Sequence, residues 1–216
     1  MLFITNRFPE QSIRTRKGRK FTFDLDNNAP SNSVFYCETG KDGSHTEITS
    51  KELLFRVKES KYRQVLLFVH GFNNLPDKVF SMTEELQKLC DKTKKNEVLV
   101  LPLIWPCDND RGVVQDYWDD QKSADQSAYS FARVLQRFMD WRNSDENDPE
   151  ADPCLKRINM LAHSMGNRVL TKALEDYARD YLERHDRGDE LEFRILLVAA
   201  DVERDVFAAA NGVFDN

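Results

Sequence analysis

The sequence predicts an α/β protein in which helices cover both faces of a mostly parallel sheet. Short, continuous apolar runs alternate along the chain with longer segments whose apolar residues recur every three or four positions. Such runs are typical of strands buried on both faces, and their alternation with helices is typical of parallel sheets. The length of 216 residues fits one domain, which we place at 1–216.

The beginning of the chain differs from the rest, because it lacks helical periodicity and contains short β-type runs. These runs are residues 2–5, 21–23 and 34–37. Asn and Pro residues at 27–32 indicate a turn between the last two runs. We therefore expect an N-terminal β segment (1–48) of antiparallel strands at one edge of the sheet, followed by a βαβ core (49–216).

The core is predicted to contain four strands and at least four helices. The apolar runs that predict strands are residues 65–69, 98–101, 158–162 and 193–200. Thr49 and Glu52 form a capping-box signature that opens a helix to about residue 60. The other helical patterns cover residues 77–94 (with a stripe that includes Leu89), 124–142 and 169–181. The acidic, proline-containing stretch 144–153 is predicted to be a surface loop.

Charge and composition exclude several classes of protein. A net charge of −6 argues against a general nucleic-acid binder, and the basic cluster at 14–20 fits a solvated loop. No apolar run is long enough for an integral membrane segment, and the N-terminus does not fit a signal peptide. The four cysteines (Cys37, Cys90, Cys107 and Cys154) are scattered, which favours reduced thiols in the cytoplasm.

The motif that carries chemistry runs from Ala162 to Gly166 and has Ser164 at its centre. It stands between a predicted buried strand and a predicted helix, which is the setting of the G-x-S-x-G nucleophile elbow. The turn must raise one hydroxyl above the sheet, and the residues two positions away must be small because the strand and helix backbones nearly touch. Ala162 and Gly166 meet that demand. We therefore assign Ser164 as the nucleophile; a buried structural serine is the alternative.

A second element, His70-Gly71-Phe72, closes an earlier buried strand. In hydrolases of this design the loop after that strand donates one backbone N–H to the oxyanion, and the residue after the nucleophile donates the other. We therefore expect the oxyanion hole to consist of the Phe72 and Met165 N–H groups. The His70 side chain fits a loop-fixing hydrogen-bonder better than a base. His163 adjoins the nucleophile and should point elsewhere at so sharp a turn.

Residues 69–74, 104–106, 161–170 and 199–207 together resemble one bacterial branch of the α/β-hydrolase superfamily, usually described as an alpha/beta hydrolase of unknown function. Members of that branch often begin with a strand ending in Thr-Asn-Arg, as Thr5-Asn6-Arg7 does here. The resemblance covers most of the chain and implies the three-layer α/β-hydrolase fold and a serine hydrolase. It implies no particular substrate.

The base of the expected triad is missing from its usual place. This fold orders the triad as Ser, then an acid, then His, and the chain contains only His45, His70, His163 and His185. His185 follows the nucleophile, but the intervening helix should carry it tens of ångströms away. His45 is placed in an N-terminal loop, where nothing favours it as a base.

The family pattern suggests that the missing partners lie beyond residue 216. The chain then is a C-terminally truncated, inactive piece of a longer hydrolase that lacks the last strands; a natural stop codon after Asn216 would contradict this. Asp201 follows a strand end, where a triad acid can sit, and the alternative is that it caps the following helix.

We therefore expect a serine hydrolase core that cleaves an ester, thioester or amide of a small-molecule or acyl substrate. The loop 106–121 would shape its pocket. No metal cluster, phosphate-binding loop or nucleotide motif is recognisable, so no cofactor is expected. The alternative is a non-catalytic scaffold of the same fold that binds a partner or ligand, since fold does not imply function. The sequence leaves the oligomeric state open.

Overall fold

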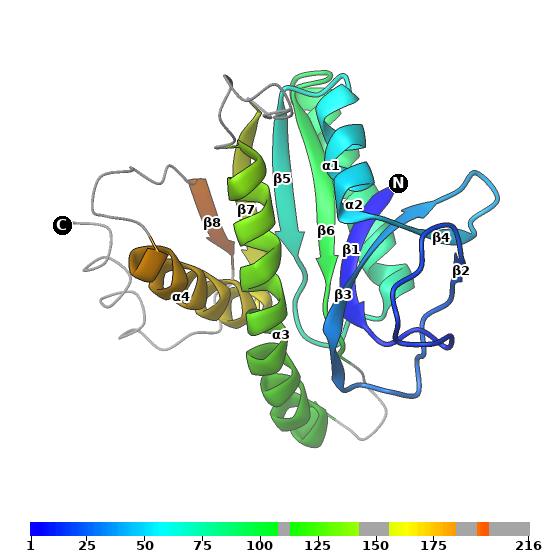
Figure 1. Cartoon of the computed structure of the whole chain (residues 1–216), viewed down its shortest axis with the longest axis vertical. Helices are drawn as coiled ribbons and strands as arrows, with labels where there is room; N and C mark the ends of the chain where they lie inside the picture. Colours follow the sequence, from blue (N-terminus) through cyan, green and yellow to red (C-terminus); the bar gives the residue numbers. More distant parts are fainter. Residues whose placement is uncertain (108–112, 143–155, 185–193, 199–216) are drawn as a thin grey trace.

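The computed structural model describes residues 1–107, 113–142, 156–184 and 194–198, and in this part of the chain an eight-stranded sheet has the order β2-β4-β3-β1-β6-β5-β7-β8 (Figure 1). The strands are β1 (Leu2–Arg7), β2 (Lys20–Phe21), β3 (Pro30–Thr39), β4 (His45–Ile48), β5 (Gln64–Val69), β6 (Val98–Ile104), β7 (Arg157–His163) and β8 (Arg194–Val198). The helices are α1 (Ser50–Glu59), α2 (Pro76–Thr93), α3 (Val113–Arg142) and α4 (Gly166–Arg184).

Strand β1 joins an antiparallel to a parallel half of the sheet. It pairs antiparallel with β3 on one side and parallel with β6 on the other. Strands β3, β4 and β2 continue the antiparallel half to the edge, as predicted for the N-terminal segment. The prediction was wrong for β1, which lies inside the sheet. Phe3 and Ile4 are both fully buried, because neighbouring strands flank β1 and the two apolar clusters cover its two faces.

Strands β6, β5, β7 and β8 run parallel, with β5 between β6 and β7. All the residues of 65–69 are buried, as the continuous apolar run predicted. Val69 pairs with Leu103 and with Ala162, so the carboxyl ends of β5, β6 and β7 lie level at one edge of the sheet. The loop after β5 and the turn after β7 therefore leave the sheet side by side.

Helices cover both faces of the sheet, which confirms the predicted three layers. Apolar residues of α1, α3 and α4 join one core cluster, including Leu53, Phe131 and Val169. Helix α2 packs on the other face through residues such as Val79 and Phe80. Figure 1 shows α3 and α4 in front of the sheet and α2 behind it.

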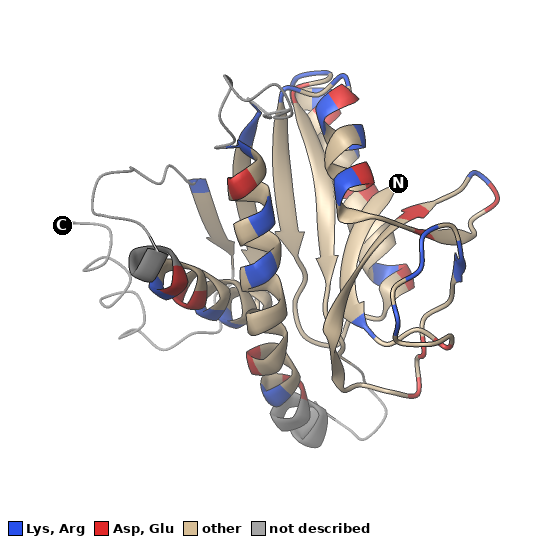
Figure 2. Cartoon of the chain, viewed as in Figure 1, with Lys and Arg blue, Asp and Glu red and all other residues tan. Residues whose placement is uncertain are grey.

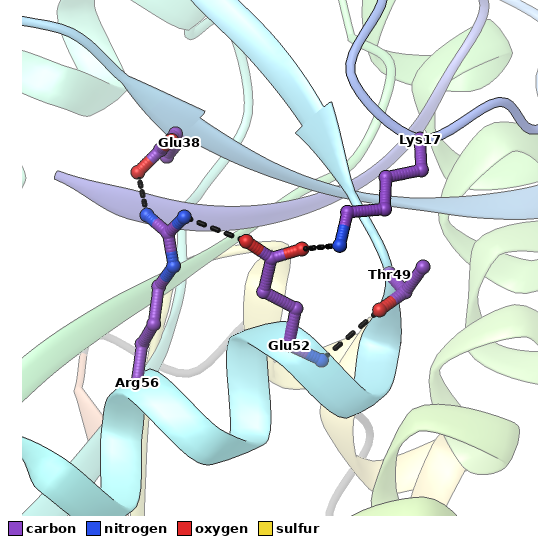
Figure 3. A network of polar contacts seen from close by, with 5 residues as sticks. All are labelled: Lys17, Glu38, Thr49, Glu52 and Arg56. Atoms are coloured by element: carbon purple, nitrogen blue, oxygen red, sulfur yellow. Dashed lines mark hydrogen bonds and ion pairs between the residues drawn. The ribbon is translucent and has the colours of Figure 1, made fainter.

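Helix α1 begins as its capping box predicted. The Thr49 hydroxyl accepts a 3.1 Å hydrogen bond from the Glu52 N–H. The Glu52 carboxylate forms ion pairs with Lys17 at 2.9 Å and with Arg56 at 2.7 Å, and Arg56 also pairs with Glu38 (Figure 3). The basic cluster at 14–20 is mostly exposed, as expected of a loop, and Lys17 ties this loop to the first turn of α1.

Three predictions on the elements need correction. Helix α3 begins at Val113, so the predicted loop 106–121 is helical from residue 113 onward; the polar run 119–123 interrupts the apolar periodicity in the sequence. Strand β8 is mostly exposed, although its sequence is apolar, because it is the last strand of the described sheet and pairs only with β7 there. Leu89 is 61% exposed and does not belong to the buried stripe of α2.

His45 also differs from its prediction. It opens β4 instead of lying in a loop, and its ring contacts the rings of Phe3, Phe23 and Phe80. In the sheet, β4 is separated from β7 by β3, β1, β6 and β5, which corresponds to roughly 24 Å at the usual strand spacing. His45 therefore cannot reach a nucleophile at the end of β7.

Charged side chains lie mainly on the helices and loops, and the central strands carry few of them (Figure 2). Among the described helices, none is both long and apolar enough to cross a membrane. The predicted acidic loop at 144–153 lies outside the described residues.

Candidate active site

Ser164 occupies the tight turn between β7 and α4. Its backbone is left-handed, with a φ of 51°, and among the described residues only Asn73 and Asn96 are other non-glycine residues with positive φ. Asn tolerates this conformation well, whereas for serine it costs about 1 kcal/mol or more. Ser164 is neither buried nor fully exposed, so it is not an interior serine. A strained, accessible serine at a strand–helix turn is the geometry that the elbow motif requires.

Two glycines allow the turn to form. A Cβ atom on Gly166 would stand 2.4 Å from the His70 carbonyl oxygen and 2.6 Å from the Val69 carbonyl oxygen, so the start of α4 lies directly on the end of β5. A Cβ atom on Gly71 would stand 2.9 Å from the Ser164 Cβ. The loop after β5 therefore passes directly beside Ser164, and no side chain fits between them.

Asn167 fastens the turn to β8. Its Nδ2 donates to the Ser164 carbonyl at 2.7 Å and to the Val198 carbonyl at 3.1 Å. The Val198 carbonyl also accepts the Ser164 N–H at 3.0 Å. Asn167 itself is fully buried, and its two hydrogen bonds are partly shielded from water. The sequence motif contains Asn167, but its spacing alone assigns it no role.

His70 is a fixed part of the loop. The Trp105 N–H donates to His70 Nε2 at 3.1 Å, which leaves the proton on Nδ1, and Nδ1–H donates to the Gly71 carbonyl at 3.0 Å. The Trp105 ring stacks on the imidazole, and its Nε1–H donates to the His70 carbonyl. Burial lowers the pKa of His70 to about 4, so its ring is neutral at pH 7. With both nitrogens occupied, His70 has no nitrogen left to deprotonate Ser164.

The two predicted oxyanion donors adjoin Gly71 and Ser164 in the sequence. Phe72 directly follows Gly71 and packs its partly buried ring on the core. Met165 follows Ser164, has no exposed surface and places its side chain in the same core cluster. Among the described residues, no acceptor bonds the Met165 N–H. The backbone N–H is therefore the only group that Met165 can offer to a ligand.

The structure brings together Ser164, Gly71, Gly166, His70 and His163 from the sequence prediction. The buried Nδ1 atom of His163 faces Gly71 and has no hydrogen-bond partner among the described residues. No hydrogen bond joins His163 to the Ser164 hydroxyl in the described part of the chain. Asp201 and His185 lie outside the described residues. The described residues contain no cluster of three His, Cys, Asp or Glu side chains that would hold a metal ion.

A cavity of about 780 Å³ lies next to the site but is not lined by Ser164. Its walls come from β2, the turn before β4 and the start of α2, and include Phe21, His45 and Lys78. Asn73, one residue after Phe72, also lines it. The loop that follows β5 therefore borders this cavity at Asn73 and Ser164 at Gly71.

Sheet order, helix placement and the strained serine at the end of the parallel strand β7 together define an α/β-hydrolase fold. The family model described as "Alpha/beta hydrolase of unknown function (DUF900)" matches residues 45–214, and the chain belongs to this family. No curated protein and no solved structure matches the chain.

Proposed function

We propose that the protein is a serine hydrolase that cleaves an ester, thioester or amide bond of a small-molecule or acyl substrate. The observation that carries the proposal is the accessible, left-handed Ser164 with the loop backbone at Gly71 directly beside it. Strain of this kind persists only where the surrounding structure enforces it, and it is concentrated at functional sites.

In the proposed reaction the Ser164 Oγ attacks the substrate carbonyl carbon, and a general base accepts the hydroxyl proton. The carbonyl oxygen becomes an oxyanion that accepts hydrogen bonds from the Phe72 and Met165 N–H groups. The leaving group departs after taking up a proton, which leaves an acyl ester on Ser164. Water then attacks this ester by the same steps and regenerates the hydroxyl.

We assign the general base to an imidazole outside the described residues. His45 lies in β4 at the far side of the sheet, both nitrogens of His70 are occupied, and His163 faces Gly71. Asp201 remains the proposed acid. We also propose a cytoplasmic location, supported by Cys37, Cys90 and Cys107, which form no disulfide in the described part of the chain.

A fluorophosphonate probe tests the hydrolase proposal, because it modifies a serine only when the serine is activated. The protein expressed from its whole reading frame is incubated with the probe, and the modified peptide is identified by mass spectrometry. We expect modification of Ser164 in the wild type and in the control Ser44→Ala, which removes a turn serine before β4, and none in Ser164→Ala. No modification of the folded wild type would reject the hydrolase and favour a binding scaffold of the same fold.

A further inference from the structure

We propose that Asn74 is a positioning residue that orients the Phe72 N–H toward the oxyanion, an inference that rests on the proposed hydrolase function. The Asn74 side chain is 5% exposed. Its Nδ2 donates to the Gly71 carbonyl at 2.8 Å and to the Phe72 carbonyl at 2.8 Å. One amide group therefore holds two consecutive peptide units of the loop after β5.

Fixing the Gly71 carbonyl also fixes the Phe72 N–H, because the two belong to one planar peptide. The described residues contain no cis peptide bond, so this carbonyl and this N–H point in opposite directions. Two donors, Asn74 Nδ2 and His70 Nδ1, hold the carbonyl on one side. The Phe72 N–H is directed to the opposite side, and Gly71 itself lies against the Ser164 Cβ.

Asn74 is in turn anchored to the segment that follows β6. Its N–H donates to Cys107 Sγ at 3.3 Å, and the Cys107 thiol donates to the Asn74 carbonyl at 3.2 Å. Cys107 is fully buried, and its carbonyl accepts a 3.0 Å hydrogen bond from the Arg7 guanidinium of β1. The loop geometry is therefore tied to two strands of the sheet. Such anchoring keeps an oxyanion donor preorganised, which is the condition under which it lowers a reaction barrier most.

The chemistry of the side chain gives a sharp test, because Asn74→Asp keeps the shape and removes both donors. An ionised Asp would place negative charge against two carbonyl oxygens and turn the peptide away. A protonated Asp regains one O–H donor. We compare the rate at which a fluorophosphonate probe modifies Ser164 in Asn74→Asp with the wild-type rate at the same pH. The Asn74→Asp rate should therefore come closer to the wild-type rate as the pH falls. An Asp introduced at the buried Asn159, away from this loop, should give no such dependence.

The experiment measures the rate at which a fluorophosphonate probe modifies Ser164 in the wild type, Asn74→Ala and Asn74→Asp. The matched control is Asn159→Asp. Asn159 is also buried and donates through Nδ2 to Gln64 Oε1 and to the Val65 carbonyl, but it lies toward the other end of the parallel strands. We expect the modification rate to fall about 10- to 100-fold in Asn74→Ala, further in Asn74→Asp at pH 8, and less than about 2-fold in folded Asn159→Asp.

Amide hydrogen exchange at Phe72, measured by NMR, supplies a readout that does not need activity. Exchange should become faster in Asn74→Ala and stay unchanged in Asn159→Asp. If folded Asn74→Ala is modified at the wild-type rate, the positioning role is overturned while the hydrolase stands. If the wild type is not modified at all, the hydrolase and the catalytic role of Asn74 both fall, and the exchange rates then show whether Asn74 orders the loop. If the exchange rate at Phe72 is the same in Asn74→Ala as in the wild type, Asn74 does not hold this part of the loop, and the positioning role is overturned.

Discussion

The backbone of Gly166 lies directly against the carbonyl oxygen of His70: a Cβ atom at position 166 would stand 2.4 Å from that oxygen. Both close neighbours, the carbonyls of His70 and Val69, are backbone atoms that belong to or directly follow β5 and cannot rotate away. The contact joins the start of α4 to the end of β5 and so sets the sharpness of the turn that holds Ser164.

Gly166→Ala should therefore destabilise the protein by about 3 kcal/mol, since the new methyl group must push two packed elements apart. Urea denaturation measures this loss. The matched control is Gly43→Ala, because Gly43 has a φ of +80° and open space around it. That substitution should cost about 1 kcal/mol through backbone conformation alone. An equal cost at both positions would contradict the close approach.

The backbone strain at Ser164 predicts an unusual order of stability. Ser164→Gly should be more stable than Ser164→Ala by about 1 kcal/mol, because glycine adopts a φ of 51° without penalty. Ser130, a buried residue within α3, serves as the matched control. There glycine should be less stable than alanine by about 1 kcal/mol, as in any helix interior. The same order at both positions, measured by thermal or urea unfolding, would show that Ser164 is unstrained.

Burial of His70 predicts a stability that depends on pH. Its pKa is about 4 in the folded protein and 6.5 in the unfolded chain, so between these values the unfolded chain binds the proton more readily. The contribution is complete above about pH 6.5 and is lost as the pH falls toward 4, by about 3 kcal/mol in all. The free energy of unfolding, followed from pH 7 to pH 4, should fall less steeply in His70→Gln. Only the slopes are compared, because the substitution also removes hydrogen bonds; parallel slopes would refute the prediction.

Two glutamates of the N-terminal half should differ in their contribution to stability. Glu47 is 2% exposed, pairs with Arg19 at 2.6 Å and accepts the Arg16 N–H at 2.9 Å. Glu47→Gln leaves the Arg19 charge without its partner in a mostly buried site and should cost about 3 kcal/mol. Glu52→Gln weakens a more exposed network (Figure 3) and should cost less than about 1 kcal/mol. The comparison is made by urea denaturation, and a larger loss at Glu52 would contradict it.

Much of the fold was determined by the sequence itself. Continuous apolar runs predicted β5 and β7, because both faces of a strand covered by helices are buried and therefore carry apolar side chains. The Thr49 cap and the small residues around Ser164 are local requirements of the backbone, so they too are visible in the chain. Edge exposure is not local: the apolar sequence of β8 looks like that of a buried strand, and only its place in the strand order leaves it exposed.

The sequence also located the tight turn at Ser164 and the loop that follows β5, since each follows from a short motif at the end of a strand. Tertiary structure alone decided which groups hold them. Asn74 is fastened by Cys107, 33 positions away, and the tautomer of His70 is set by the N–H of Trp105. Arg7 reaches Cys107 across 100 positions. Such contacts depend on how strands are ordered and aligned in the sheet, which is a property of the packed chain as a whole and leaves no periodic signal in the residues that make them.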